Sequence, residues 1–488
     1  MTNIDAIRPY AENPFYWQYK GKPVLLLGGS VEDNLFQIPN LADHLDLLKS
    51  VGGNYVRCTM SSRDPGDVWP FAFDATRGLY DLEKPGEEYW RRFAHFLELT
   101  AQRDIILQIE VWDRFDFARA PWQDNPFNPQ NNVNYSAEES GLKPVIETHP
   151  GRCESDFFHT VPVLQNNQTV LRYQHAFVDR LLDHTLAYGN ILYCMDNETN
   201  DSPEWGWYWA RHIRRRAEAI GAEVHLTEMW DAWDLSDPQH SYTIDRTDLY
   251  SFVDFSQNNH QEGETHYRNF QAQRRRIAES GHVRPINTVK TYGANTGAHG
   301  TSRNGQESFW RHVLGGVAAA RFHRPPSGHG LDPIAQANIR SARQLTDRID
   351  IFNCRPANDL LQNRFRNEAF CFAQPGIEYA VYFTDGGDLY LKSDVDVSIE
   401  WLHVLNSEWQ KPQILRSNNG LVHLQTPTTY GYWALLVHPI DKQKRLWTRI
   451  GRNTDFFDPC SFQSVSTTPR QLKGFSNLKS PNRPITSC

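Results

Sequence analysis

Asn197 and Glu198 are the residues whose position most strongly suggests chemistry, because they directly follow the apolar run Ile191–Met195. A Glu at the end of a buried strand can face a pocket, where burial or a neighbouring carboxylate raises its pKa. Such a carboxyl group can donate a proton to a leaving oxygen, and the Asn amide can hydrogen-bond a substrate hydroxyl. The motif therefore predicts acid/base catalysis by Glu198, as in the hydrolysis of a glycosidic bond.

Hydrolysis of this kind also needs a second carboxylate. Glu228 is the first choice, because it ends the next strand predicted along the chain, in the run HLTEMWDAWD. A separation of about 6.5–9.5 Å between the two carboxyl groups would indicate inversion through a water, and about 5–5.5 Å would indicate a nucleophile. The other candidates for the second carboxylate are Asp33, Glu110, Asp113 and Asp231.

Side chains that suit sugar recognition also follow the predicted strands. Aromatic rings can cover the apolar face of a ligand while polar groups fix its orientation, although packing against the protein's own core is the alternative for any single Trp. A polar run ends at His260. The aromatic candidates are Trp112, Trp122, Trp230, Trp233 and Tyr292. The residues predicted to bind substrate are Arg57, Asp113, Asn197, Trp230, His260, Lys290 and Tyr292.

Eight apolar runs, most of them followed by a helical pattern, must position these side chains. Eight strand-then-helix units in about 350 residues predict an α/β fold, a (β/α)8 TIM barrel. A doubly wound sheet is the alternative, which the lack of a glycine-rich loop after the first strand disfavours. The predicted strands are Pro23–Leu27, Tyr55–Met60, Ile105–Val111, Ile191–Met195, Val224–Met229, Tyr250–Phe255, Pro285–Lys290 and Gly316–Phe322. The predicted helices are Leu41–Val51, Glu87–Arg103, Arg172–Tyr188, Trp205–Ile220, Tyr267–Ala278, Glu307–Gly315 and Asp332–Ile349.

The pattern along the chain also predicts domain boundaries. Residues 1–350 are expected to form the barrel, and the segment Phe115–Leu171 is a long insertion expected over its C-terminal mouth, where active sites lie. From about residue 355 the apolar period becomes alternating, which predicts a small all-β sandwich over residues 351–439. Residues 440–488 have no clear period and are expected to be a poorly ordered tail.

Composition limits the function classes. The 488 residues carry a net charge of −8, so a basic nucleic-acid surface is not expected. No apolar run is long enough to cross a membrane. The N-terminus lacks the features of a signal peptide, which predicts a cytoplasmic protein, although a secreted chain without its leader would look the same. The seven cysteines form no CxxC motif, and His260, His299, His323 and His329 lack metal-ligand spacing. We expect no metal and no cofactor.

Several of these motifs resemble a known group of enzymes. Residues 53–57 (GNYVR) and the pair Asn197-Glu198 resemble the second-strand and fourth-strand motifs of clan-A glycoside hydrolases, which are (β/α)8 barrels. The run NPFYWQYKGKPVLLLGG is similar to the opening of glycosidases related to apiosidase, and YAVYFTDGGDLYLK is similar to their collagen-binding-like β-domain. The resemblance implies that Glu198 is the acid/base, that Arg57 supports the catalytic carboxylates and that the partner is a carbohydrate.

One departure from the family pattern keeps alternatives open. In the clan-A enzymes that this chain resembles, a nucleophilic Glu ends the seventh strand. This chain has Lys290 at the corresponding position. The leading hypothesis is a glycoside hydrolase with the pair Glu198 and Glu228. A second hypothesis is a lyase or aldolase that forms a Schiff base on Lys290. A third is a non-catalytic carbohydrate-binding relative. Lys290 would otherwise form an ion pair with Glu198 or Glu228.

Overall fold

The computed structural model describes residues 5–297 and 299–440, and its centre is a sheet of eight parallel strands. The spatial order is β10-β9-β8-β5-β4-β13-β12-β11. The end strands meet where the Ser251 N–H donates to the Leu226 carbonyl at 3.1 Å. The predicted (β/α)8 barrel is therefore confirmed. Its strands are β4 (Leu26–Gly29), β5 (Tyr55–Thr59), β8 (Ile106–Asp113), β9 (Ile191–Asn197), β10 (Leu226–Thr227), β11 (Val253–Asp254), β12 (Ile286–Thr291) and β13 (Ala319–Phe322).

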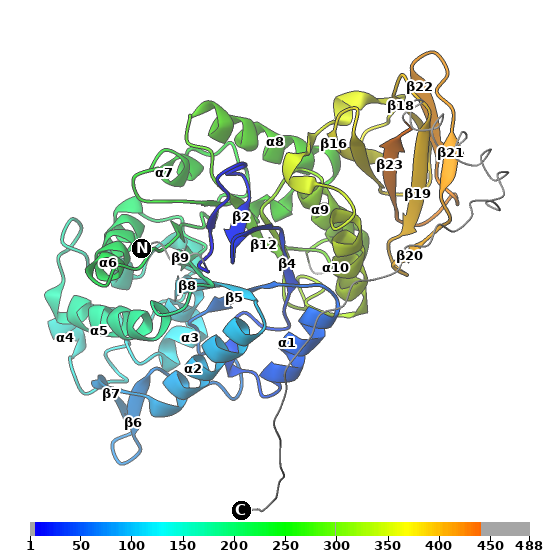
Figure 1. Ribbon diagram of the computed structural model, residues 1–488. Coiled ribbons are helices and arrows are strands. Elements are labelled where there is room, and N and C mark those ends of the chain that lie inside the picture. The colour runs from blue at the N-terminus through cyan, green and yellow to red at the C-terminus, as the bar shows by residue number, and fades with distance from the viewer. Residues whose placement is uncertain (1–4, 298, 441–488) are drawn as a thin grey trace, which may run out of the picture. The chain divides into compact units, whose positions relative to one another are not determined.

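Helices surround this sheet and follow the strands in turn (Figure 1). The fifth repeat differs from the pattern, because only the four-residue helix α7 follows β10. The helices are α1 (Leu41–Ser50), α2 (Glu87–Gln102), α5 (Gln168–Thr185), α6 (Pro203–Ala219), α7 (Ser241–Ile244), α8 (Gly263–Glu279), α9 (Ser302–Val313) and α10 (Pro333–Thr346).

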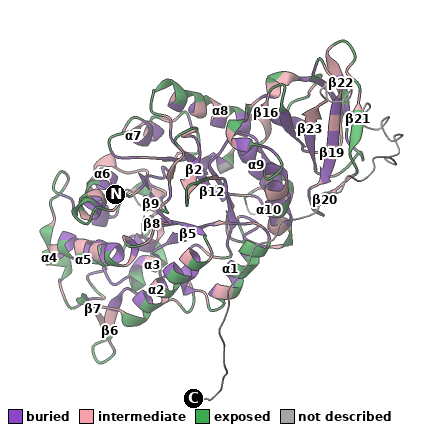
Figure 2. Cartoon of the chain, viewed as in Figure 1, coloured by how far each residue is buried: buried purple, intermediate pink, exposed green. Residues whose placement is uncertain are grey.

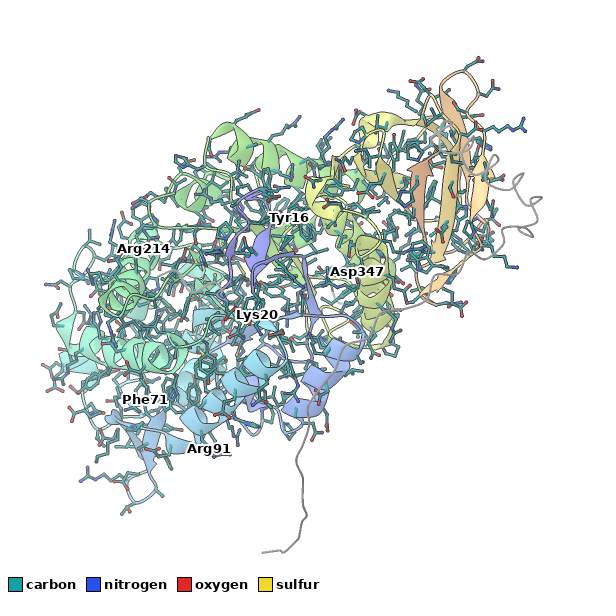
Figure 3. The ribbon with its side chains drawn as sticks, in the orientation of Figure 1. Tyr16, Lys20, Phe71, Arg91, Arg214 and Asp347 are labelled. Carbon is teal, nitrogen blue, oxygen red and sulfur yellow. The ribbon has the colours of Figure 1, made fainter. Side chains whose placement is uncertain are left out.

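The helices are amphipathic, as their residue spacing predicts. On α2, the predicted stripe that contains Trp90, Phe93 and Phe96 is buried. The inner strands are buried and the outer faces of the helices are exposed (Figure 2). Figure 3 shows Arg91 on α2 and Arg214 on α6, both in the outer layer. An apolar layer between strands and helices therefore holds the barrel together.

An N-terminal antiparallel sheet closes the end of the barrel at which the parallel strands begin. It consists of β1 (Arg8–Pro9), β2 (Trp17–Tyr19) and β3 (Lys22–Val24). The fully buried Trp17 packs with Leu26 and Tyr55 of the barrel strands, and its Nε1 donates to Asn287 Oδ1 at 2.9 Å. The Tyr55 hydroxyl donates to Gln108 Oε1 at 2.6 Å. Because these buried polar groups are paired, they form a fixed floor below the mouth.

The segment Phe115–Leu171 contains α3 (Arg119–Asp124) and α4 (Ala137–Ser140) but is otherwise mostly irregular. Its many Asn residues have a structural role. Asn128 Nδ2 donates to the Trp122 and Pro144 carbonyls, each at 2.9 Å, and Asn132 Nδ2 donates to the Pro126 carbonyl at 3.0 Å. These side chains satisfy backbone groups that no regular element pairs.

A further hairpin, β6 (Phe71–Asp74) and β7 (Leu79–Pro85), follows β5.

Beyond the barrel, two antiparallel sheets pack against each other through a shared apolar core, which confirms the predicted β-sandwich. Contacts with the barrel include Trp310 stacked on Tyr382, with ring centroids 4.9 Å apart. The division at residues 350 and 351 stays a prediction. One sheet contains β14 (Arg355–Pro356), β16 (Ala369–Gln374), β17 (Glu378–Phe383), β19 (Val397–His403), β20 (Glu408–Trp409), β21 (Gln413–Leu415) and β23 (Trp433–Pro439); the other contains β15 (Leu361–Gln362), β18 (Asp388–Lys392) and β22 (Leu421–Gln425).

Three sequence expectations concern the chain as a whole. Residues 441–488, which cover nearly all of the expected tail, lie outside the described residues. Within the part of the chain that the structure describes, no helix has both the length and the apolar character to cross a membrane. Cys58, Cys153, Cys194, Cys354 and Cys371 are free thiols.

Candidate active site

Glu198 and Lys290 form an ion pair at the mouth of the barrel, from the ends of β9 and β12. Lys290 Nζ also donates to Asn197 Oδ1 at 2.7 Å. Burial opposes ionisation of Glu198, but the attraction of Lys290 outweighs it and lowers the Glu198 pKa. The lowered pKa favours the ionised form of the Glu198 carboxylate, and the acid/base role that the sequence predicts for Glu198 stays a prediction.

The backbone of Glu198 has a φ of +60°, a left-handed conformation that is uncommon for residues other than Gly. Strained backbone of this kind clusters at functional sites, where the surrounding structure holds it in place. The side chain is 13% exposed, so its carboxylate is accessible at the edge of a buried cluster. The conformation turns Glu198 out of the strand that ends at Asn197.

Asn197 contacts Lys290 directly, and Asp113 in turn holds Asn197. Asn197 Nδ2 donates to Asp113 Oδ1 at 3.0 Å, and Asp113 forms an ion pair with Arg63. Asp113 and Asn197 are paired in the β8–β9 register, so adjacent strands fix this chain of contacts. Both side chains are almost fully buried. They therefore position Lys290, whereas the sequence predicted direct substrate contacts for them.

Arg57 lies fully buried in the barrel and bridges two carboxylates. Its Nε donates to Glu110 Oε1 at 2.8 Å, and a second guanidinium nitrogen is paired with Asp33. Burial favours a higher Asp33 pKa, but Arg57, His323 and Arg324 together hold it well below its usual range. Arg57 therefore positions charges beneath the mouth. Its predicted role in substrate binding stays a prediction, and Arg57 pairs with two of the carboxylates that sequence reasoning considered.

Asp231 is the predicted second-carboxylate candidate that lies partly exposed beside Glu198. The Thr199 N–H donates to the Met229 carbonyl at 3.0 Å, and the Asp231 N–H donates to the Thr199 carbonyl at 2.9 Å. These bonds hold the segments after β9 and β10 side by side. Burial first, and then the negative charge of Glu198, raise the Asp231 pKa to about 6.

The long insertion reaches Asp231, as expected for a segment over the mouth. Asn200 Nδ2 donates to Asp231 Oδ2 at 2.8 Å and lies 3.5 Å from the Gly151 carbonyl. A Cβ atom on Gly151 would lie 3.2 Å from Asp231 Oδ2. Gly at position 151 therefore lets the insertion approach the carboxyl group closely.

Glu228, the other member of the predicted catalytic pair, is buried beside α6 and is not brought together with Glu198 at the mouth, so the pair stays a prediction. It is 1% exposed, and its Oε1 accepts from the backbone N–H groups of Asp196 at 2.9 Å and Met229 at 3.1 Å. A Cβ atom on Gly206 of α6 would lie only 2.1 Å from Glu228 Oε2, so this carboxyl group faces the helix layer. Burial, together with the Asp196 charge, raises its pKa well above 4.5.

The predicted aromatic candidates divide by burial. Trp112, Trp122 and Trp230 are at most 2% exposed. Trp230 Nε1 donates to Thr243 Oγ1 at 2.9 Å, so this ring packs within the protein, and its predicted contact with substrate stays a prediction. Trp233, two residues after Asp231, is 57% exposed and offers a free ring face.

Tyr292 and the exposed His260 lie on the β12 and β11 side of the mouth. Tyr292 packs against His260, His299 and His323, with ring centroids 5.9, 5.0 and 4.8 Å away. Burial lowers the His260 pKa, while the charge of Glu198 acts in the opposite direction. Both predicted residues therefore stand near Glu198, where the neutral His260 imidazole can exchange hydrogen bonds with hydroxyl groups.

Solved structures with a similar fold include glycoside hydrolases. One glycoside hydrolase aligns at a TM-score of 0.59 and 11% identity, over 89% of this chain and 97% of its own. A glycoside hydrolase family 5 protein from Bacteroides vulgatus aligns at a TM-score of 0.59 and 12% identity. The alignment covers 89% of this chain and 93% of that protein. The chain has the fold of the glycoside hydrolase barrels. A family 5 mannosidase from Rhizomucor miehei aligns at 0.50 and 10%, over 70% of this chain and 98% of its own.

No family model and no curated protein matches the chain. The fold is thus the property shared with these structures. The finer resemblance to glycosidases related to apiosidase, with a collagen-binding-like β-domain, stays a prediction. Sequence reasoning ranked Asp231 behind Glu228, and the burial that distinguishes the two carboxyl groups comes from the fold.

Proposed function

We propose that the protein is a glycoside hydrolase that cleaves an O-glycosidic bond with Glu198 and Asp231. The supporting observation is that the two carboxyl groups have opposite pKa shifts. Lys290 lowers the pKa of Glu198 against the effect of burial, whereas burial and the charge of Glu198 raise that of Asp231 to about 6. Pairs of titratable groups whose pKa values are pushed apart indicate the acid and the base of a site.

In this proposal Asp231 carries the proton that the leaving oxygen receives. Glu198 stays ionised, so it attacks the anomeric carbon or activates a water that does so. Lys290, held by Asn197, keeps the Glu198 carboxylate in place. Trp233 and Tyr292 supply ring faces, and His260 supplies a hydrogen-bonding group, for a carbohydrate partner.

Release of reducing sugar from a panel of oligosaccharides and aryl glycosides tests the proposal. Wild type is expected to act on at least one substrate, and Glu198→Gln and Asp231→Asn are each expected to lower kcat by roughly 100-fold or more, the lower limit for a lost acid or base. Asp234→Asn, in the same loop and exposed, is the matched control. Full activity of either active-site variant on a true substrate contradicts the proposal, and the product anomer separates direct attack from water activation.

A non-catalytic carbohydrate-binding protein is the second candidate, and the Glu198–Lys290 pair is the observation that favours it. A cation that neutralises the carboxylate at the mouth weakens its use as a nucleophile. This candidate predicts sugar binding, measured by calorimetry, without turnover of any substrate in the panel. It also predicts that Trp233→Ala weakens binding, whereas Asp231→Asn leaves it nearly unchanged.

The Schiff-base alternative needs a free, unprotonated amine on Lys290. The amine is instead engaged by the Glu198 carboxylate and the Asn197 amide oxygen. This pairing opposes that chemistry. Borohydride trapping with a keto-sugar is therefore expected to leave no adduct on Lys290.

A further inference from the structure

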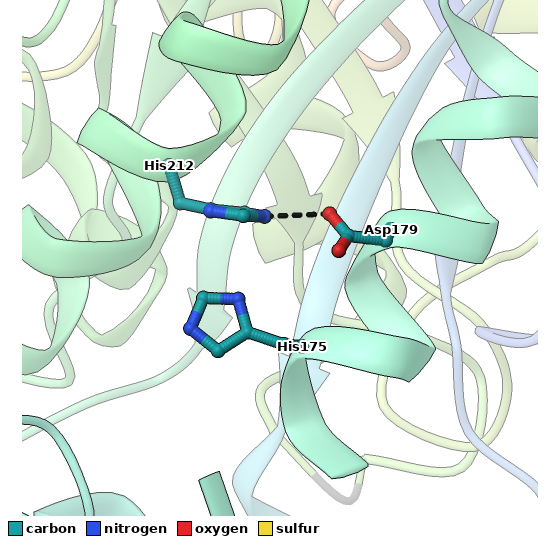
Figure 4. Close-up of side chains that lie close together, drawn as sticks. All are labelled: His175, Asp179 and His212. Carbon is teal, nitrogen blue, oxygen red and sulfur yellow. Dashed lines mark hydrogen bonds and ion pairs between the residues drawn. The ribbon is translucent and has the colours of Figure 1, made fainter. Parts of the chain in front are cut away.

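A second cluster of chemically competent side chains lies on the outside of the barrel, where α5 and α6 are neighbours. His175 and Asp179 are one turn apart on α5, so they share a face of that helix, and His212 comes from α6. One potential ligand atom from each residue lies within 4.8 Å of the others. Figure 4 shows the three side chains converging between the helices.

The contacts of His175 select which of its nitrogens is available. His175 Nε2 is 2.6 Å from the Tyr208 hydroxyl, while the other ring nitrogen is turned toward His212 and Asp179 (Figure 4). Histidines that bind metals commonly make such a hydrogen bond with their second nitrogen, which fixes the tautomer and the ring orientation.

We propose that His175, Asp179 and His212 form a binding site for a divalent transition-metal ion such as Zn²⁺. Two imidazole nitrogens and one carboxylate oxygen are a donor set that zinc uses, with a water in the fourth position. His212 Nε2 is 2.7 Å from Asp179 Oδ1, and the ion takes the place of the proton between them. Two donors that lie about 2.0–2.1 Å from a tetrahedral zinc ion are about 3.3 Å apart, so small side-chain rotations complete the site.

The exposure of the cluster suits an ion that enters from solvent. The Asp179 side chain is 37% exposed, and that of His212 is 11% exposed. Arg216 forms ion pairs with Asp179 and, at 2.8 Å, with Asp183. Arg216 therefore competes with the ion for Asp179, and this competition makes a specific prediction possible. The site is on the outer helices and is independent of the proposed hydrolase activity at the mouth.

Binding of Co²⁺ to the chelator-treated full chain, followed by absorption spectroscopy, is the first test, with Zn²⁺ titration by calorimetry as the second. Wild type is expected to bind one equivalent with the visible bands of a cobalt site. His175→Ala and His212→Ala are each expected to weaken this equivalent on the order of 100-fold. Tyr208→Phe is expected to cost roughly tenfold, as loss of an outer partner does.

Two further variants keep the test decisive when a ligand variant is less stable. Arg216→Ala is expected to strengthen binding, because the competing cation is removed. His184→Gln, also on α5 but stacked on Trp90 outside the cluster, is the matched control and is expected to bind like wild type. The proposal is overturned if wild type binds no stoichiometric Co²⁺ or Zn²⁺. It is also overturned if the folded His175→Ala and His212→Ala proteins bind as wild type does.

Discussion

Lys290 donates to Glu198 across the mouth of the barrel, from β12 to the residue that follows β9. The same ammonium group is held by Asn197 Oδ1 at 2.7 Å. The ion pair places the Glu198 carboxylate, whose pKa is lowered, at the mouth. The carboxyl group with a raised pKa then comes from Asp231, on the neighbouring strand end.

Activity is expected to have an acidic optimum. Glu198 must be ionised and its pKa is lowered from 4.5, whereas Asp231 must be protonated and its pKa is about 6. The rate should rise as pH increases through the Glu198 pKa, and fall above about pH 6 as Asp231 loses its proton. The kcat/KM profile of wild type checks this. In Asp231→Asn the fall in kcat/KM above about pH 6 should be absent. If the fall is unchanged in that variant, it is caused by another group.

The Asp231→Asn protein is expected to be more stable than wild type at pH 7. A carboxyl pKa that is higher in the folded state stabilises the fold fully below the unfolded value of 3.8, and this contribution is lost as pH rises through about 6. After allowance for partial exposure, the gain in free energy of unfolding at pH 7 is about 1–2 kcal/mol. Urea denaturation at pH 7 and pH 4 measures it, and an equal effect at both values refutes the titration argument.

Replacement of Lys290 alone is expected to destabilise the fold more than replacement of Lys290 and Glu198 together. Lys290→Met leaves the largely buried Glu198 carboxylate unpaired, which costs about 3 kcal/mol. The double variant Lys290→Met/Glu198→Gln should recover about half of that loss. A double-mutant cycle by chemical denaturation measures the coupling, with Glu198→Gln completing it. Additive single effects would mean that the two charges do not interact.

The backbone at Glu198 is expected to make Gly more stable than Ala at this position. Both substitutions remove the carboxylate, but only Gly adopts the φ of +60° without steric cost. The free energy of unfolding of Glu198→Gly should therefore be about 1 kcal/mol higher than that of Glu198→Ala. Thermal and urea unfolding of the two variants, side by side, decide this. If Ala is the more stable, the left-handed conformation is absent.

Glu228→Gln is expected to keep the activity of wild type. The burial-driven rise in pKa favours the protonated Glu228 carboxyl group, which an amide resembles in shape and charge. Its Oε1 can still accept from Asp196 and Met229. Turnover assays on the substrate that wild type cleaves provide the measurement. A loss of turnover on the order of 100-fold, with the fold intact by circular dichroism, would restore Glu228 as a catalytic candidate.

Sequence reasoning located the strands because their apolar runs are buried on both faces, and it placed Glu198 correctly at the end of β9. It misplaced Glu228 because β10 comprises only Leu226–Thr227. So short a strand does not reveal which side the next residue takes. The burial of Trp230 and the meeting of His175 with His212 depend on helix neighbours that no local pattern contains.

The sequence by itself determined the barrel, its order of strands and helices, and the residues at the strand ends, because hydrophobic periodicity and chain connectivity are local properties. Only the tertiary structure decided which carboxyl groups lie near one another and which are paired with a cation. Lys290 and Glu198 are 92 residues apart in sequence, yet closure of the barrel brings their charges into contact. Burial and the charges of distant residues then set the pKa of Glu198 and Asp231, and these are properties of the folded chain.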